Sequence, residues 1–541
     1  MKLSPQQVVQ RFENMKSQRG VWETHWQDLA DYNLPMKDQF NRKNVRGEKK
    51  GIELYDSTAM VSCDLLSSAL HGMLTNPNSL WFLLSTTDEQ LNSNEQVIEY
   101  LQELTRRAHN IMNLSNFQTE VHEFYLDLCC FGTATMTVEE DEDAIVRFST
   151  KHLSNIFIKE NAFGVVDQVY RRFSFTAHQV VEKFRPQLLG ASEKELEKEL
   201  GPRIAKSFIN NSEEEFEIVH AVYRDFEDKS SRPFKSDYVL ISDKVLLSEG
   251  RFKRFPYIVS RWTKLSGEVY GRSPAMNALP ESKTLNIMAK TVLKGAQKVV
   301  DPPMQMPDDG FVRPLRTAPA SINYYRAGTQ DLVKPIFNDT RIDFGFQALE
   351  AHQNKVRQAF YIDRLNLQNN DRMTTVEVNQ RVQEQLRFMG PMLGRQQTEF
   401  LRPLNDLVLD MMIDRDRDGD VIGNPPPEIA EVNLDIKYTS PVARAQRVSE
   451  ADAMQQALAA SGPMFELDPN AVDVIDAEKI VRENFAIFGA PQKVLRKQAE
   501  VEAIREAKQQ AQEAALQQQQ QLQESEVVKN VAPAIQNQGQ V

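Results

Sequence analysis

An acidic run in the C-terminal half has the spacing closest to that of a metal site. Residues 414–421 read Asp-Arg-Asp-Arg-Asp-Gly-Asp-Val, which matches the opening of a calcium-binding loop, with glycine sixth and an aliphatic residue eighth. The twelfth position, where such loops carry a bidentate glutamate, is Pro425, and two arginines weaken the negative field. The favoured interpretation is an acidic turn that ends a helix. Three carboxylates remain as candidate metal ligands, and as the ligands of an alternative function, a metal-dependent nuclease: Asp414, Asp416 and Asp418.

Other residue types that could perform catalysis lack the spacing that catalysis needs. No GxxxxGK[ST] phosphate cradle occurs, and His122-Glu123 has no second histidine four residues on to complete a zinc helix. Ser273 lacks the closing glycine of a nucleophile elbow, and the adjacent Cys129 and Cys130 lack zinc-ligand spacing. The sequence therefore predicts a protein that is not an enzyme and uses no cofactor.

A stripe of positive charge is the most regular polar feature. The spacing predicts a helix over residues 275–299, with an apolar stripe that includes Leu285, Val292 and Val299. Asp301-Pro302-Pro303 ends it, because proline cannot continue a helix. Its opposite face carries four lysines at intervals of seven, four and four residues: Lys283, Lys290, Lys294 and Lys298.

A second amphipathic helix is predicted over residues 340–363, after an insert at 301–338 that contains six prolines. Its apolar face includes Phe346, Leu349 and Val356. A helical hairpin with one apolar and one charged edge suits side-by-side packing of copies in a ring around a central hole. This hairpin is the main clue to function.

The remaining elements predict an α+β chain that is predominantly helical. Periodicity predicts helices at 4–32, 54–74, 94–112 and 116–131, followed by strands with period two. The expected strands lie at 144–148, 156–158, 165–173, 217–226, 237–247 and 257–262, with a hairpin turn at 161–164 and one polar helix at 176–210. A third long helix, about 375–413, should kink at Pro391 and Pro403, and a strand at 434–438 and helices at 443–460, 471–488 and 492–523 follow.

The totals limit the class of protein. At 541 residues the chain is long enough for three or more substructures, and its net charge of −12 argues against non-specific wrapping of nucleic acid. No stretch supplies the ~20 apolar residues of a membrane span, and the N-terminus lacks an apolar signal core. Three cysteines without CxxC spacing predict reduced thiols in a cytoplasm-like compartment.

Three stretches, in this order and spacing, resemble the portal, or head-to-tail connector, proteins of short-tailed bacteriophages. They are Val-Tyr-Gly-Arg-Ser-Pro at 269–274, the region from Thr374 to Leu404, and Tyr-Thr-Ser-Pro-Val-Ala-Arg-Ala-Gln at 438–446. The resemblance implies a dodecameric ring at one capsid vertex, through which double-stranded DNA is packaged and ejected. The implied parts are a wing (1–270), stem helix 1 (271–300), a clip (301–338), stem helix 2 (339–365), a channel loop (366–374), a kinked wing helix and strand (375–440), and a helical crown with a disordered tail (441–541).

The same resemblance assigns candidate sites. DNA would meet the four lysines and the channel loop, through Asn366, Gln368, Asn369, Asn370 and Arg372. The clip would dock a terminase motor and later tail adaptors, through Asp308, Asp309, Arg313, Arg316, Tyr324 and Tyr325. Capsid and scaffolding proteins would be further partners in the virion, assembled in the host cytoplasm.

Plainer interpretations stay open beside these sites. The lysines would also suit a solvated or inter-subunit face, with Asp339, Asp343 and Glu350 as partners, and the loop would also suit an ordinary connector. A cellular ring-forming scaffold with no viral role is a third possible function.

Overall fold

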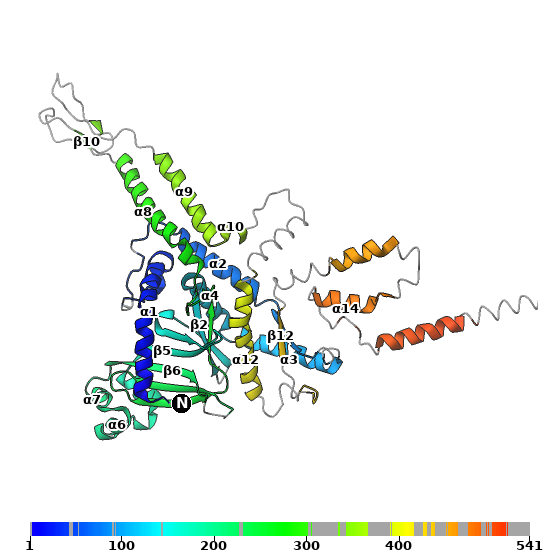
Figure 1. Cartoon of the computed structure of the whole chain (residues 1–541), viewed down its shortest axis with the longest axis horizontal. Coiled ribbons are helices and arrows are strands. Elements are labelled where there is room, and N and C mark those ends of the chain that lie inside the picture. The colour runs from blue at the N-terminus through cyan, green and yellow to red at the C-terminus, as the bar shows by residue number, and fades with distance from the viewer. Residues whose placement is uncertain are drawn as a thin grey trace, which may run out of the picture. The chain divides into compact units, whose positions relative to one another are not determined.

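The computed structural model describes residues 3–365, 390–438 and 451–517, with gaps within these ranges. The gaps are residues 43–46, 52, 89–90, 92–93, 142–143, 227–230, 301–303, 306–333, 336–341, 391, 416–425, 430–433, 452, 464–473, 488–493, 495, 497–499 and 516. The chain divides into two compact units, residues 1–442 and 443–541. Helices dominate and sheets are mostly antiparallel, so the predicted α+β class is confirmed (Figure 1).

Four helices form the N-terminal part of the first unit: α1 (Pro5–Asn33), α2 (Thr58–Leu74), α3 (Glu95–Leu114) and α4 (Phe117–Phe131). All four were predicted, with one boundary error at α2. The helix begins at Thr58 rather than at residue 54, where the Asp56 carboxylate accepts a hydrogen bond from the Thr58 backbone N–H at 2.8 Å. A capping box between Ser4 and Gln7 fixes the start of α1.

A five-stranded antiparallel sheet has the order β4-β5-β6-β7-β8. Its strands are Ile156–Glu160, Val166–Thr176, Glu215–Arg224, Phe234–Leu240 and Leu246–Phe252. The predicted turn at 161–164 joins β4 to β5, with Gly164 at φ +77°. The single strand predicted at 237–247 is wrong: the chain turns back between β7 and β8, and Lys244 in that turn has φ +53°.

The two faces of this sheet have different covers, because alternate residues of a strand point to opposite sides. In β6, Phe216 and Ile218 pack with the short helices, whereas Val219 and Ala221 pack with Val8, Val9 and Phe12 of α1. The single helix predicted at 176–210 is wrong. Three helices replace it, α5 (Ala177–Phe184), α6 (Glu193–Leu200) and α7 (Pro202–Asn210), since Pro186 and Gly201 (φ +91°) interrupt the run.

A second sheet has the order β3-β2-β9, from Ile145–Lys151, Thr133–Asp141 and Tyr257–Arg261. Strand β2 was not predicted. Its first six residues are all buried, so it lacks the alternation that reveals a half-exposed strand. Strand β1 (Phe82–Thr86) was also missed, and it pairs with the predicted strand β12 (Leu434–Tyr438).

The helical hairpin consists of α8 (Pro274–Val300) and α9 (Ile342–Ala359), which lie side by side (Figure 1). The predicted second helix ends early, because Tyr361 adopts φ +61° before the short α10 (Ile362–Leu365). Strands β10 (Met304–Gln305) and β11 (Lys334–Pro335) pair at the far end of the hairpin.

The third long helix is described from residue 390 onward. A π-helical turn, Gln397–Leu401, leads into α12 (Arg402–Arg415), so the helix is irregular beside Pro403, where a kink was predicted. Pro391 lies outside the described residues. The second unit contains α14 (Ala477–Ile487) and helical residues at 453–463 and 500–515, and Arg505 pairs with Glu478 at 2.9 Å. The predicted disordered tail lies almost wholly outside the described residues.

A buried histidine in β6 is expected to make the first unit sensitive to acid. His220 stacks on Tyr238 with ring centroids 4.0 Å apart, and its ring nitrogens hydrogen-bond the Tyr257 hydroxyl at 2.9 Å and the Ser236 hydroxyl at 2.8 Å. Burial lowers the pKa of His220 to about 3, from 6.5. The folded state therefore favours the neutral ring, and its contribution to stability is lost as the pH falls below 6.5.

We expect this histidine to lower the free energy of unfolding by about 2 kcal/mol between pH 7 and pH 5. Thermal unfolding of wild type and His220→Gln at both values tests this: the variant should lose less stability on acidification. His178→Gln, at an exposed histidine, is the matched control and should keep the wild-type profile. Equal losses in wild type and His220→Gln would contradict the expectation.

Candidate functional site

The start of α8 is fixed to the end of α4 by an unusually close backbone approach. A Cβ atom on Gly271 would lie 2.1 Å from the Gly132 carbonyl oxygen, and Gly132 has φ +77°. The Gly271 N–H donates to the Thr133 hydroxyl at 2.8 Å. The Ser273 hydroxyl donates to the Cys130 carbonyl at 2.7 Å and accepts from the Met276 N–H at 3.1 Å, which caps α8.

Aromatic residues of α1 hold the same segment from the other side. Tyr270 is buried and packs edge-on against Trp26, with ring centroids 5.0 Å apart. The Arg272 guanidinium lies 4.5 Å from the Trp22 ring centroid and pairs with Glu268. The Val-Tyr-Gly-Arg-Ser-Pro stretch therefore anchors the hairpin to α1 and α4, a role that its sequence did not reveal.

The two helices of the hairpin are joined by polar and apolar contacts. Glu281 of α8 accepts from His352 at 2.7 Å and lies 3.6 Å from the Lys355 ammonium of α9. Gly345 packs so closely that a Cβ there would lie 3.0 Å from a Val292 methyl group. These contacts hold α8 and α9 against each other at two levels of the hairpin.

The lysine stripe is partly engaged within the chain. Lys283 pairs with Asp28 of α1 at 2.8 Å and lies 5.5 Å from the Tyr32 ring centroid. Lys290 lies 5.1 Å from the Tyr55 ring centroid. Lys294 and Lys298 are exposed toward the far end of α8. The partner of Lys283 is thus a residue of α1, which sequence spacing within the hairpin could not predict.

A buried arginine fixes the π-helical turn to strand β9. The Arg261 guanidinium pairs with Glu160 and, at 2.8 Å, with Glu399, and its side chain is only 3% exposed. Gln396 donates to the Arg261 carbonyl at 3.1 Å and accepts from the Ser260 hydroxyl at 2.8 Å. Sequence reasoning missed this cluster, since its members come from three separate elements.

Comparison with known proteins identifies the family of this chain. The sequence profile of the family described as bacteriophage head to tail connecting protein matches residues 5–495. The chain belongs to this family. The portal protein of Salmonella phage epsilon15 is 28% identical over 514 residues, which cover 93% of this chain and 90% of that protein. A probable portal protein of Bordetella phage BPP-1 is 26% identical over 487 residues, which cover 87% and 85% of the two chains. The predicted resemblance to portal proteins is confirmed.

Most of the other predicted site residues of this connector lie outside the described residues. They are the channel-loop residues Asn366, Gln368, Asn369, Asn370 and Arg372, the clip residues Asp308, Asp309, Arg313, Arg316, Tyr324 and Tyr325, and two of the acidic-run residues, Asp416 and Asp418. Asp414 is described at the end of α12, where it lies 3.6 Å from the Lys253 ammonium. In the described part of the connector, no three His, Cys, Asp or Glu side chains gather in a way that could hold a metal ion.

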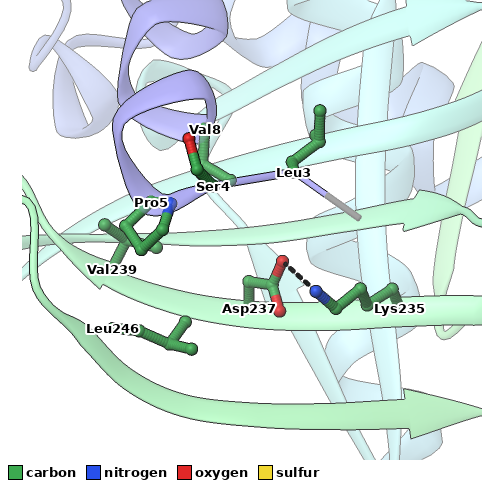
Figure 2. Close-up of a pocket in the computed structure, with 8 residues that line it drawn as sticks. All are labelled: Leu3, Ser4, Pro5, Val8, Lys235, Asp237, Val239 and Leu246. Atoms are coloured by element: carbon green, nitrogen blue, oxygen red, sulfur yellow. Dashed lines mark ion pairs between the residues drawn. The ribbon is translucent and has the colours of Figure 1, made fainter. Parts of the chain in front are cut away.

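A small cavity lies where the N-terminus of the connector crosses the five-stranded sheet (Figure 2). Its polar wall is a buried pair, Lys235 and Asp237, with the ammonium and carboxylate 3.3 Å apart. The Tyr223 hydroxyl donates to Asp237 at 2.7 Å, and burial raises the pKa of the Asp237 carboxyl. The rest of the lining comes from the start of α1 and from the sheet: Leu3, Ser4, Pro5, Val8, Val239 and Leu246.

Among the described helices, none combines the length and the apolar character that a bilayer span requires.

Proposed function

We propose that this chain is a structural portal subunit whose copies form a dodecameric ring at one capsid vertex. Double-stranded DNA would pass through the ring during packaging and ejection. The observation that carries the proposal is a connector-family chain whose helical hairpin leaves large apolar side chains in solvent. Ile287 is 64% exposed, Val300 86% and Phe344 75%, and neighbouring copies would cover such residues.

The hairpin would serve as the channel wall and the wing as its support. Lys283 lies against Asp28 of α1 and Lys290 against Tyr55. DNA would contact the hairpin further along α8, at Lys294 and Lys298, and the loop at 366–374. Few phosphate contacts suit a channel, because each neutralised phosphate adds affinity and a moving duplex must not be held. The net charge of −12 per copy keeps phosphates away from most other surfaces.

The partners follow from this placement in the virion. A terminase motor would dock on the clip, around residues 308–325, during packaging, and tail adaptor proteins would use the same surface afterwards. Capsid and scaffolding proteins would hold the wing. The chain itself would perform no chemistry, and ATP hydrolysis would belong to the motor.

Negative-stain electron microscopy of the purified full chain tests the proposal. We expect twelve-fold rings with a hole wide enough for duplex DNA, and no Mg²⁺-dependent cleavage of plasmid DNA. A chain that stays monomeric under all assembly conditions would overturn the proposal. Cleavage that Asp414→Ala or Asp416→Ala abolishes would instead support the metal-dependent nuclease.

A further inference from the structure

A pocket opens on one face of the helical hairpin. It is a cavity of about 420 Å³ between α8, α9 and the loop that precedes α2. Its lining mixes apolar and polar side chains. The apolar and aromatic ones include Tyr55, Ala289, Leu293 and Phe346, and the polar ones are Asp56, Glu350, Gln353 and Arg357. Leu293 is 51% and Phe346 54% exposed, so the apolar lining is open to solvent in the single chain.

Side-chain hydrogen bonds hold the loop that forms one side of the pocket. The Asn286 side chain of α8 accepts from the Tyr55 N–H at 2.7 Å and donates to the Glu53 carbonyl at 3.0 Å. The Gln353 side chain of α9 donates to the Asp56 carboxylate at 2.8 Å. The loop is therefore tied to both helices, and the pocket keeps its shape without an occupant.

The opposite face of the same hairpin carries exposed apolar side chains of matching kind. Residues two apart on a helix point about 200° away from each other, so Phe344 faces away from Phe346. Ile287 precedes Ala289, which lines the pocket, by two residues and therefore points about 200° away from it. Phe344 and Ile287 are 75% and 64% exposed. Both faces lie at the same level of the hairpin, because Gly345 touches Val292.

The charges on the two faces are complementary. Lys294 follows Ile287 by seven residues, so it lies on the same face as Ile287. Glu350 follows Phe346 by four residues and lines the pocket. One face therefore offers apolar side chains with a cation beside them, and the other a hollow lined by two carboxylates, Asp56 and Glu350, and one guanidinium, Arg357, with a negative formal balance.

We propose that the pocket of one copy receives Phe344 and Ile287 of the next copy, with Lys294 placed against Glu350. The two contacting surfaces are different parts of one molecule, so each copy can accept one neighbour and enter another. Such a contact generates a ring when the rotation between copies closes. The inference rests on the proposed function, because it requires a ring. It also assigns Lys294 to the subunit interface, and it leaves Lys298 and the loop at 366–374 as candidates for DNA contact.

Site-directed cross-linking of the full chain tests the contact. The double variant Phe344→Cys with Leu293→Cys, treated with a short bis-maleimide, should give a ladder of covalent oligomers on a denaturing gel. The natural thiols Cys63, Cys129 and Cys130 are all fully buried, so they should not react in the folded protein. The matched control is Phe344→Cys with Leu114→Cys, at an exposed residue of α3 outside the hairpin, and it should give no ladder.

A single substitution gives a second readout. Phe344→Asp should leave circular dichroism and thermal unfolding of the monomer unchanged, since the side chain is exposed, and should reduce the fraction of chains in rings at least tenfold. Wild-type rings without a ladder in the Phe344/Leu293 pair, or normal rings of Phe344→Asp, would overturn this contact while the portal function stands. Absence of rings in the wild type would overturn the portal function itself.

Discussion

Gly271→Ala is expected to prevent the connector from folding into an assembly-competent form. A Cβ atom at this position would lie 2.1 Å from the Gly132 carbonyl oxygen and 2.9 Å from the Arg261 Cβ. The obstructing oxygen belongs to backbone, which cannot move aside as a flexible side chain can. Relief would require the start of α8 to leave α4, with loss of the hydrogen bonds of Gly271 and Ser273. We expect a loss of about 4 kcal/mol or more in the free energy of unfolding.

The measurements are soluble yield, chemical denaturation and ring formation by electron microscopy. Gly295→Ala, within α8, is the matched control. No atom lies within 4 Å of a Cβ built there, and alanine favours a helix over glycine by about 1 kcal/mol, so this variant should be as stable as wild type or slightly more so. Normal rings with Gly271→Ala would show that the close approach of the two glycines is dispensable.

Local periodicity predicted most of the helices that carry the site. The apolar stripe of α8 and the proline run after it gave bounds of 275–299 against the observed Pro274–Val300. The hairpin turn at 161–164 and strand β12 were likewise confirmed. In each case the signal lies within one element and its immediate flanks, where a side-chain period of two or 3.6 residues can be read.

The errors share a physical cause. Strand β2 is buried on both faces and so shows no alternation, and β1 is recognised only by pairing with β12, some 350 residues later. The partner of Lys283 is Asp28, and that of Arg261 is Glu399. Such contacts depend on tertiary packing, which spacing along the chain does not encode.

The portal-like stretch at 269–274 has a structural explanation in this chain. The start of α8 is fixed by three residues. Tyr270 packs on Trp26, Gly271 lies against the Gly132 backbone, and Ser273 donates to the Cys130 carbonyl. They do not lie along the exposed part of the hairpin. The stretch that resembles portal proteins therefore fixes the start of the proposed channel wall. Lys294 and Lys298 lie further along α8 and would make the contacts with neighbouring copies or DNA.

Arg261→Met is expected to destabilise the first unit by about 3–5 kcal/mol. The arginine bridges Glu160 and Glu399 and also donates to the Gly164 carbonyl at 3.1 Å. The other cations that pair with these carboxylates, Lys264 at 2.6 Å from Glu160 and Arg395 at 2.9 Å from Glu399, are less buried than Arg261. Methionine matches much of its length and apolar stem, but it leaves both carboxylates in a site that is largely screened from water. The π-helical turn would lose its link to β9, and chemical denaturation monitored by tryptophan fluorescence would measure the change.

A double-mutant cycle separates the Arg261–Glu399 interaction from general destabilisation of the first unit. Removing one carboxylate charge in Arg261→Met with Glu399→Gln should recover part of the loss, with a coupling free energy of about 1–3 kcal/mol. Arg106→Met is the control, because its guanidinium also pairs with a glutamate, Glu103, but is 57% exposed, and its stability should stay close to that of wild type. If the effects of Arg261→Met and Glu399→Gln simply add, the pair does not hold the turn. A coupled pair, in contrast, would make the π-helical turn a fixed extension of strand β9, and the kinked helix would then start from a rigid support.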